Sequence, residues 1–358
     1  MKALIAAGGR ATRLRPITHT INKHLIPLAN KPMIEFAIEK MADAGIREVA
    51  INTNPGDTEL SNALGDGSRF GVRLTFIEQQ GGPRGVGHII QNASAWVGDE
   101  PFVFYLGDNI ILGSIRPLVE RFVNEDLDCL LALSRVENPQ RFGVPEFSDG
   151  RIVRVIEKPA DPPSPYAVTG IYLYKPCVFN AASQVQPSPR GEIEISDVHT
   201  KLIEQGRRVG YEEITGWWKD TGKPEDLLEG NALLLAEACR TGRCSLGTVE
   251  EGAVIQGSVI VGEGSVINSG SVIRGPVSIG RNCRIVNAVV GPHVSVGNDV
   301  TIEHTILTNS LVMDEAMIAG GGRISDSIFG RKTRVVHGGS GASRGHAFII
   351  GDNAVVEL

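Results

Sequence analysis

The first two thirds of the chain alternate short apolar runs with amphipathic segments. The apolar runs favour β-structure and predict strands at 2–7, 48–52, 72–77, 102–106 and 128–133. Between them, 33–45 and 115–125 carry apolar residues at helical spacing, and Lys31-Pro32 and Gly45 suit a helix start and stop. Strands that alternate with helices indicate a mostly parallel, Rossmann-like α/β sheet, in which ligands bind beyond the carboxyl ends of the strands.

After about residue 250 the hydrophobic period changes to six. The aliphatic residues recur in one phase, and after a slip of one residue they continue: Ile255, Val261, Ile267, Ile273, Ile279, Ile285, Val290, Val296 and Ile302. This period is typical of a hexapeptide β-helix, in which three hexads form a triangular coil. A series of ordinary edge strands is the weaker alternative. Because 358 residues exceed one ordinary core, we expect two domains, at 1–242 and 243–358.

Composition and charge exclude several classes of partner. The net charge is −6 and no long basic run occurs, which argues against nucleic acid. No apolar stretch approaches the length of a membrane span. The five cysteines form no C-x-x-C pair and suit free thiols in a reducing compartment. We therefore expect a cytoplasmic protein that binds small molecules.

The first predicted strand leads into glycines and then into a cluster of arginines, in the sequence GGRATRLRPIT at 8–18. Gly8 and Gly9 let backbone N–H groups approach a ligand closely. Arg13 can grip phosphate oxygens with two N–H groups, and Lys23 adds a further positive charge. A solvated arginine cluster on a surface loop is the plain alternative, but the order of strand, Gly-Gly and Arg favours phosphate binding.

Two aspartates in later motifs are candidate metal ligands. Asp108 ends a strand in YLGDN, and Asp220 follows two tryptophans in GWWKDTG. Carboxylates that face a triphosphate site could hold a divalent cation, whereas either aspartate alone would equally suit a turn or a helix cap. The DLD sequence at 126–128 precedes a strand and is interpreted as a solvated turn.

These stretches stand in the order of the motifs of the sugar-phosphate nucleotidyltransferases. GGRATRLRPIT, YLGDN, FGVPEF, VIEKP, VTGIYLY, SPRGEIEISD and GWWKDTGKPEDLLEGN each match in turn. The chain most resembles the long form of glucose-1-phosphate thymidylyltransferases, which carries a left-handed parallel β-helix after the nucleotidyltransferase domain. The resemblance implies transfer of a deoxythymidylyl group from dTTP to glucose 1-phosphate with Mg2+, giving dTDP-glucose and pyrophosphate. It also implies a homo-oligomer, since a β-helix offers flat faces for assembly.

The resemblance assigns roles to particular residues. The nucleotide would be bound by Gly8, Gly9, Ala11, Thr12, Arg13, Gln80, Gly85 and Asp108. The metal ligands would be Asp108 and Asp220. The sugar phosphate would be bound by Gly143, Glu157, Lys158, Val168, Gly170 and Arg190. The catalytic charges would be Arg13, Lys23 and Lys158.

The sequence departs from the family pattern at Ala11, where the family has glycine, and at Gly87, where it has alanine. If residue 11 takes a positive φ, alanine carries a strain of roughly 1 kcal/mol. Three other functions remain open. One is the use of UTP or another hexose 1-phosphate, and one is a non-catalytic regulatory subunit. The third is an acyltransferase in the β-helix, with His293 or His304 as base, although surface histidines of an assembly domain are the simpler interpretation.

Overall fold

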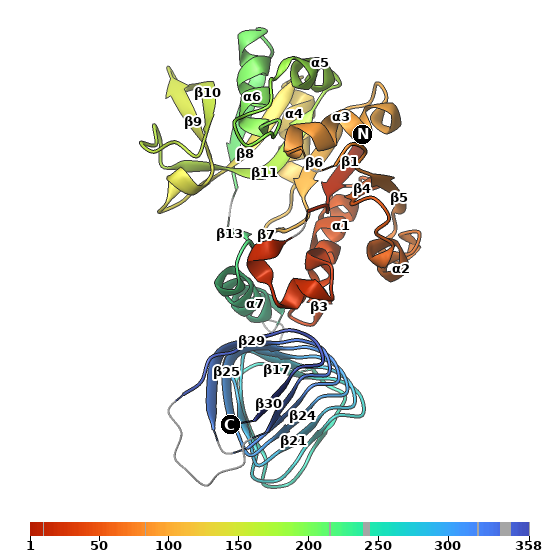
Figure 1. Ribbon diagram of the computed structural model, residues 1–358, viewed down its shortest axis with the longest axis vertical. Helices are drawn as coiled ribbons and strands as arrows, with labels where there is room; N and C mark the ends of the chain where they lie inside the picture. Colours follow the sequence, from red (N-terminus) through yellow and green to blue (C-terminus); the bar gives the residue numbers. More distant parts are fainter. Residues whose placement is uncertain are drawn as a thin grey trace. The chain divides into compact units, whose positions relative to one another are not determined.

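The computed structural model describes residues 1–9, 11–82, 84–214, 216–238, 244–320, 322–336 and 345–357. Contacts divide the chain into two compact units, each of them built from two separate stretches of sequence (Figure 1). Unit 1 is Met1–Gly9 with Ile34–Asp220, and unit 2 is Arg10–Met33 with Thr221–Leu358. The predicted domain boundary between 242 and 243 lies outside the described residues and stays a prediction.

Unit 1 is built on a mostly parallel sheet of seven strands, as predicted. The strand order is β12-β8-β11-β6-β1-β4-β5, and only β11 runs antiparallel to its neighbours β6 and β8. The five predicted strands correspond to β1 (Lys2–Ala6), β4 (Glu48–Thr53), β5 (Arg73–Glu78), β6 (Phe102–Leu106) and β8 (Cys129–Arg135). The other two strands are β11 (Tyr166–Tyr174) and β12 (Val209–Glu213).

Helices pack on this sheet through apolar stripes. Buried side chains of α3, α5 and α6 form one core with Leu4, Phe104 and Leu131 of the strands. Helix α1 begins at Met33, directly after Pro32, and ends before Gly45, which takes a φ of 83°. The helices are α1 (Met33–Asp43), α2 (Glu59–Leu64), α3 (Val86–Val97), α4 (Arg116–Asn124), α5 (Cys177–Gln184) and α6 (Ile195–Glu204).

Two small ribbons extend from unit 1. The antiparallel hairpin of β9 (Gly143–Ser148) and β10 (Arg151–Glu157) places Glu157 opposite Gly143. The second ribbon pairs β7 (Asn109–Ile111) with β13 (Trp218–Asp220), which joins segments a hundred residues apart in sequence. Both ribbons carry predicted site residues.

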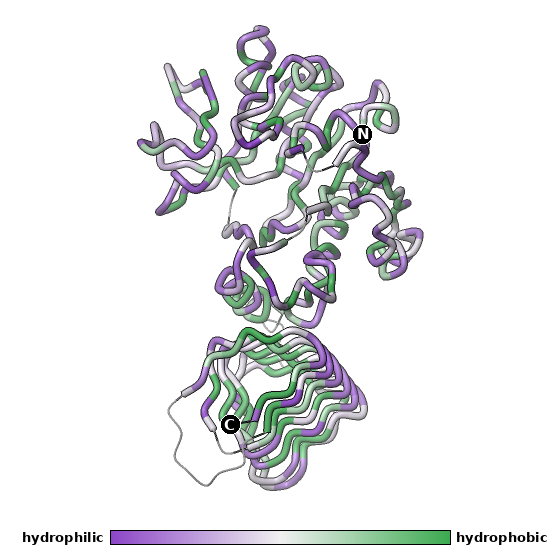
Figure 2. Tube along the Cα trace, viewed as in Figure 1, coloured by the Kyte–Doolittle hydropathy of each residue, from purple (hydrophilic) through white to green (hydrophobic). Residues whose placement is uncertain are grey.

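Unit 2 contains the predicted parallel β-helix. Strands pair in parallel with strands one coil later, as Ile267↔Ile285↔Ile302 shows. Apart from the partly buried Ile255, every residue of the predicted hexad series is at most 1% exposed, because these side chains fill the interior of the coils. Figure 2 shows the apolar positions repeating from coil to coil. The handedness of the β-helix stays a prediction.

The β-helix strands are short and numerous. They are β14 (Cys244–Ser245), β15 (Thr248–Val249), β16 (Val254–Gln256), β17 (Val259–Val261), β18 (Val266–Ile267), β19 (Val272–Arg274), β20 (Val277–Ile279), β21 (Arg284–Val286), β22 (Val289–Val290), β23 (Val294–Val296), β24 (Thr301–Glu303), β25 (Ile306–Val312), β26 (Met317–Ala319), β27 (Arg323–Phe329), β28 (Arg334–Val336), β29 (Ile349–Ile350) and β30 (Val355–Glu357).

Unit 2 also contains the segment after the first strand and the helix before the β-helix. The segment carries three 3₁₀ turns, η1 (Thr12–Leu14), η2 (Ile17–His19) and η3 (Lys23–Leu25), and the hairpin of β2 (Pro27–Leu28) and β3 (Lys31–Pro32). The helix is α7 (Pro224–Ala238). Across the described residues, no helix is both long enough and apolar enough to cross a membrane.

Candidate active site

The loop after β1 is held by the amide side chain of Asn54, the residue directly after the neighbouring strand β4. Gly9 N donates to Asn54 Oδ1 at 2.9 Å, and Asn54 Nδ2 donates to Gly9 O at 3.2 Å. A Cβ at Gly8 would lie 3.3 Å from Asn52 Oδ1, and Gly9 takes a φ of 109°. The left-handed backbone at Gly9 favours glycine, and at Gly8 a side chain would press on the Asn52 amide. The sequence pattern predicted the two glycines, but not Asn52 and Asn54.

The candidate base-binding segment follows β5. Gln80, which the resemblance assigned to the base, is exposed, and its backbone N donates to Asn92 Oδ1 at 3.1 Å. The preceding Gln79 is only 4% exposed, and its Oε1 would lie 3.5 Å from a Cβ at Gly8. His88 lies between these groups, with its ring nitrogens 3.1 Å from Gln79 Nε2 and 3.0 Å from Asn92 Nδ2. Burial, and then the charge of Arg84, lower the pKa of His88.

Gly85 and Gly87 let the N-terminus of α3 press against residues 192–193. Ile193 N donates to Arg84 O at 2.7 Å, and Gly87 N donates to Ile193 O at 3.0 Å. A Cβ at Gly85 would lie 2.8 Å from Ile193 O, and one at Gly87 would lie 2.5 Å from Ile193 Cγ2. The departure from alanine at position 87 therefore fits the tight packing against Ile193 in this chain.

The arginine segment belongs to unit 2. Ala11 takes φ 43° and ψ 42°, so the condition under which alanine is strained at this position is met. Thr12 and Arg13 are exposed, and the Arg13 guanidinium lies beside Gly222, where a Cβ would be 3.1 Å from its Nη2 atom. Lys23 begins η3, directly after its capping residue Asn22. Thr12 and Arg13 thus lie in η1, and Lys23 lies in η3 of the same segment of 3₁₀ turns.

The β7–β13 ribbon brings the two predicted metal ligands together. Asp220 pairs with Asn109, the residue directly after Asp108. Asn109 Nδ2 donates to Asp108 Oδ1 at 2.9 Å, and Trp218 Nε1 donates to Asn109 Oδ1 at 2.6 Å. The Tyr105 hydroxyl donates to Asn109 O at 3.0 Å. Burial, and then the charge of Asp108, raise the pKa of Tyr105, so its hydroxyl stays a donor.

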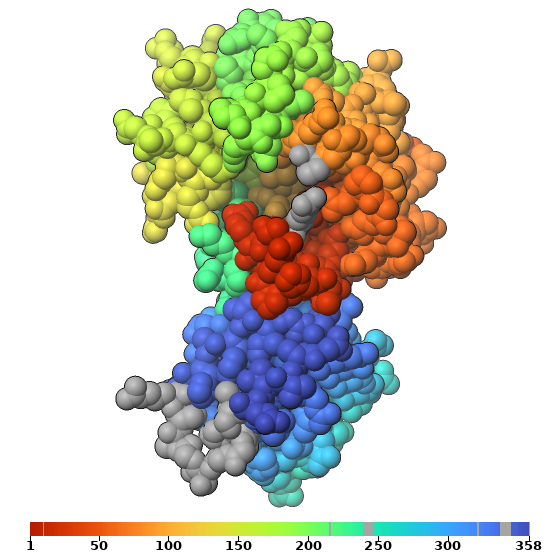
Figure 3. Space-filling view, in the orientation of Figure 1, coloured from red at the N-terminus to blue at the C-terminus, as the bar shows by residue number. Residues whose placement is uncertain are grey.

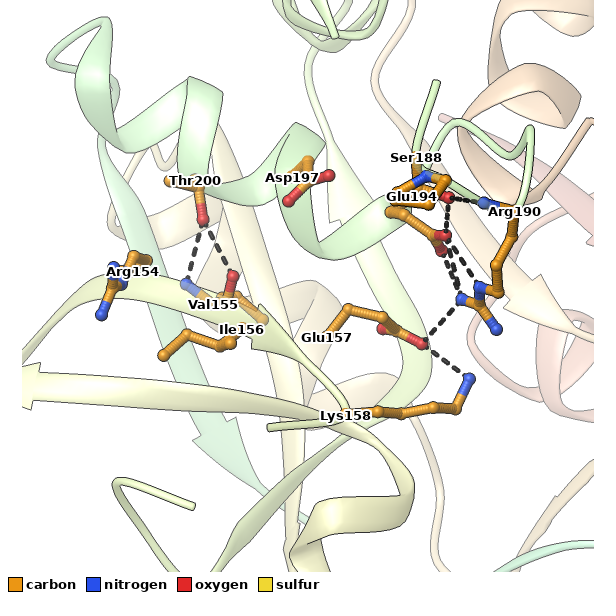
Figure 4. A pocket seen from close by; sticks show the side chains of 11 residues that line it. Arg154, Val155, Ile156, Glu157, Lys158, Ser188, Arg190, Glu194, Asp197 and Thr200 are labelled. Carbon is orange, nitrogen blue, oxygen red and sulfur yellow. Dashed lines mark hydrogen bonds and ion pairs between the residues drawn. The ribbon is translucent and has the colours of Figure 1, made fainter. Parts of the chain in front are cut away.

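A cluster of charges surrounds Glu157 at the end of β10 (Figure 4). Its Oε1 lies 2.7 Å from Lys158 Nζ and 3.5 Å from an Arg190 guanidinium nitrogen, and its Oε2 accepts from Ser196 Oγ at 2.9 Å. A Cβ at Gly143 would lie 2.6 Å from the same Ser196 hydroxyl. Because Gly143 has no side chain, it leaves space for the hydrogen bond between the Ser196 hydroxyl and the Glu157 carboxylate.

These charges line a cavity of about 580 Å³ between β10, α6 and the 188–190 loop (Figure 4). Arg190 also donates to both oxygens of Glu194, at 2.9 Å each, and this hydrogen bonding raises the pKa of the guanidinium. Asp197 lies in the same cavity, where burial, followed by the charges of Glu194 and Glu157, raises its pKa. Arg154 also lines the cavity, which thus offers three cations and hydrogen-bond acceptors to one ligand.

Val168 and Gly170 lie on β11 at an irregularity in its pairing with β8. Gly170 takes a φ of 81°, and a Cβ there would lie 2.5 Å from Leu106 Cδ1. Glycine at this position therefore lets β11 approach the carboxyl end of β6.

The DLD aspartates form ion pairs away from the ribbon. Lys175 Nζ lies 2.7 Å from Asp126 Oδ1 and 3.6 Å from Asp128 Oδ1. Asp126 takes a φ of 51°, as expected for a turn, and the two carboxylates are occupied by basic partners.

Comparison with known proteins identifies the class. Residues 2–237 match the family described as "Nucleotidyl transferase", and the chain belongs to this family. It is therefore an enzyme, a sugar-phosphate nucleotidyltransferase.

Two relatives match the chain along its whole length. One is a low-salt glycan biosynthesis nucleotidyltransferase, Agl11, of Haloferax volcanii, which is 42% identical over 100% of both chains. A glucose-1-phosphate thymidylyltransferase of Streptomyces griseus is 40% identical over 100% of this chain and 99% of its own. A solved UDP-glucose pyrophosphorylase with bound UDP-glucose has a TM-score of 0.60 at 26% identity, and covers 66% of this chain and 98% of its own.

Proposed function

We propose that the enzyme transfers a deoxythymidylyl group from dTTP to glucose 1-phosphate and releases pyrophosphate. The observation that carries the proposal is the 40% identity, over the whole chain, to the thymidylyltransferase of Streptomyces griseus. The chemistry of the Glu157 cluster supports it, since a carboxylate can accept hydrogen bonds from sugar hydroxyls while Lys158 and Arg190 attract a phosphate.

The triphosphate would be gripped by groups of two kinds. The backbone at Gly8 and Gly9 is open to close approach, and the exposed Arg13 can bind phosphate oxygens with two N–H groups. Lys23 supplies a point charge for the α-phosphate. Gln79 is a candidate for contact with the base in addition to Gln80, because its side chain is buried against Gly8.

The donor set at the β7–β13 ribbon fits Mg2+. Asp108 and Asp220 provide hard carboxylate oxygens from adjacent positions of the ribbon. In the described part of the chain, no group of three His, Cys, Asp or Glu side chains is placed to hold a metal. This suits Mg2+, which commonly takes one or two protein carboxylates and completes its shell with phosphate oxygens and water. When bound, the cation neutralises charge on the phosphates.

The proposed reaction is an in-line displacement. A phosphate oxygen of glucose 1-phosphate forms a bond to the α-phosphorus of dTTP while the bond from that phosphorus to the bridging oxygen breaks. The electron pair leaves with pyrophosphate, and no covalent bond to the enzyme forms. Lys158 and Arg190 hold the attacking phosphate, while Arg13 and Lys23 offset the charge on the triphosphate. Positioning and charge neutralisation are the main sources of catalysis in such transfers.

The likeness to a UDP-glucose pyrophosphorylase makes UTP the second candidate nucleotide. Pyrophosphate release should be measured with dTTP and UTP, each with glucose 1-phosphate and other hexose 1-phosphates, with and without Mg2+. We expect the highest kcat/KM for dTTP with glucose 1-phosphate, and no turnover without divalent metal. Lys158→Ala should raise the KM for the sugar phosphate. A higher kcat/KM with UTP would refute the dTTP assignment, and inactivity with every pair would support the regulatory-subunit alternative.

A further inference from the structure

One outward-facing row of the β-helix is buried. Strand residues alternate in direction, so the interior positions of Val277 and Ile279 leave Ser278 facing outward. Its equivalents in the next coils are Ser295, Leu311 and Ile328. These four residues are 6, 1, 1 and 0% exposed, although their side chains point away from the interior of the coils. This row is therefore covered by other parts of the same unit.

Helix α7 and the β2–β3 hairpin cover the row. Helix α7 packs against β23, β25 and β27. Its Asn231 is fully buried, and the Oδ1 atom accepts from Ser295 Oγ at 2.6 Å and from Ala29 N at 2.8 Å. A single amide oxygen thus bridges the β-helix and the hairpin turn.

Asn30 makes the direct connection. Its Nδ2 atom lies 2.8 Å from Val296 O, 3.0 Å from Ser278 Oγ and 3.3 Å from Ser278 O. Ala29 and Asn30 take φ values of 48° and 64°, as a two-residue type I′ hairpin turn requires. Asparagine therefore serves both the turn and the contact with the β-helix.

The same segment touches the β-helix a second time, near its C-terminal coil. A Cβ at Gly351 would lie 3.0 Å from Pro16 O. In Figure 3 the red N-terminal segment adjoins the blue C-terminal coils. Pro16 is three residues after Arg13, and Asn30 is seven residues after Lys23. Each contact with the β-helix therefore lies a few residues after one of the two charges assigned to the triphosphate.

We propose that the β-helix positions the phosphate-binding segment at 11–33, and that Asn30 is the positioning residue of this contact. The inference rests on the proposed function, because that function assigns Arg13 and Lys23 to the phosphates. Assembly and positioning would then be separate tasks of the β-helix. A loosened segment would weaken nucleotide binding, while the sugar-phosphate cluster around Glu157, which belongs to unit 1, would remain intact.

Asn30→Gly tests the inference in the full chain, since glycine keeps the positive φ and removes the amide. We expect the KM for the nucleotide to rise about ten-fold, with the KM for glucose 1-phosphate changed less than about two-fold. Amide hydrogen exchange should accelerate across 11–33. The matched control is Asn309→Gly, also at a positive φ, which removes a 2.6 Å hydrogen bond to Asp326 on the same β-helix and should change neither readout.

Asn30→Asp is the second variant, because it puts a carboxylate against Val296 O and Ser278 O and should act at least as strongly as glycine. Arg13→Ala and Lys23→Ala separate the two proposals. If both leave turnover unchanged, the phosphate assignment and the inference that rests on it are refuted. If they abolish turnover while both Asn30 variants match the wild type in nucleotide KM and exchange, only the positioning role is refuted.

Discussion

At the scale of single residues, the Cβ atom of Ala11 disfavours the left-handed backbone conformation that its loop imposes. Its left-handed backbone is fixed within the loop, because Ala11 O accepts from Thr18 Oγ1 at 2.8 Å and from Leu14 N at 3.0 Å. An L-residue with a Cβ is disfavoured in this conformation by roughly 1 kcal/mol. Since these hydrogen bonds belong to the folded loop, the strain lowers the stability of the fold.

We therefore predict opposite effects of two substitutions at this position. Ala11→Gly should raise the free energy of unfolding by up to about 1 kcal/mol, because glycine adopts the left-handed region freely. Ala11→Val should lower it by more than about 1 kcal/mol, since a β-branched side chain tolerates this region least. Urea unfolding at constant m-value measures both, and equal stability of the three proteins would contradict the strain.

At the scale of elements, the β7–β13 ribbon determines whether the two aspartates act together. Asp108→Asn and Asp220→Asn should each lower turnover roughly a hundred-fold, because each removes a charge from the proposed cation site. Stability should change little, since both aspartates lie partly exposed at the end of the ribbon. Pyrophosphate release over a magnesium titration measures the effect.

The control for these variants is Asp126→Asn. It makes the same chemical change at an exposed turn, where asparagine tolerates the positive φ and only surface ion pairs to Lys175 and Arg208 are lost. It should keep wild-type turnover. A magnesium dependence of either Asp108→Asn or Asp220→Asn that matches the wild type would refute the metal assignment.

The contact between α6 and β11 makes stability depend on pH. His199 of α6 is fully buried, its Nε2 lies 2.6 Å from the Tyr174 hydroxyl, and burial lowers its pKa to about 3. In the unfolded chain histidine titrates near about 6.5. Between these values the unfolded chain binds a proton that the folded protein does not, so stability falls as pH decreases, by ~1.4 kcal/mol per pH unit.

His199→Gln removes this titration. The stability advantage of the wild type over the variant should therefore be largest near neutral pH and should shrink as pH falls below about 6.5. Urea unfolding of both proteins at several pH values between about 7 and 4 measures the difference. Parallel pH profiles would show that His199 does not carry the effect.

At the scale of the whole molecule, the chain crosses between its two compact units three times, after residues 9, 33 and 220. The segment that carries Arg13 and Lys23 is therefore grouped with the β-helix, although it lies more than two hundred residues earlier in the sequence. Periodicity and composition describe continuous stretches, so they predict a single boundary near 242. They do not show that the segment at 10–33 packs against the β-helix, which follows it by more than two hundred residues.

The sequence by itself determined the elements and the kinds of chemistry. Strands, helices and coils follow from hydrophobic spacing, because burial requires the period of each element to match its apolar positions. Gly8, Gly9 and the positive φ of Ala11 were predictable from backbone sterics and motif order. Ordered motifs also indicated the nucleotidyltransferase class, which the comparisons confirmed.

Only the tertiary structure decided which polar side chains meet. Asn54, Gln79 and Trp218 support the candidate site from separate elements, and Asn30 and Asn231 fasten the hairpin to the β-helix. A polar residue next to a strand has many possible partners in sequence. Its hydrogen bonds form only with the groups that chain folding brings within about 3 Å. A buried polar group must form such hydrogen bonds, because it has lost its contact with water. Burial itself results from packing between segments, whereas the sequence pattern describes each segment separately.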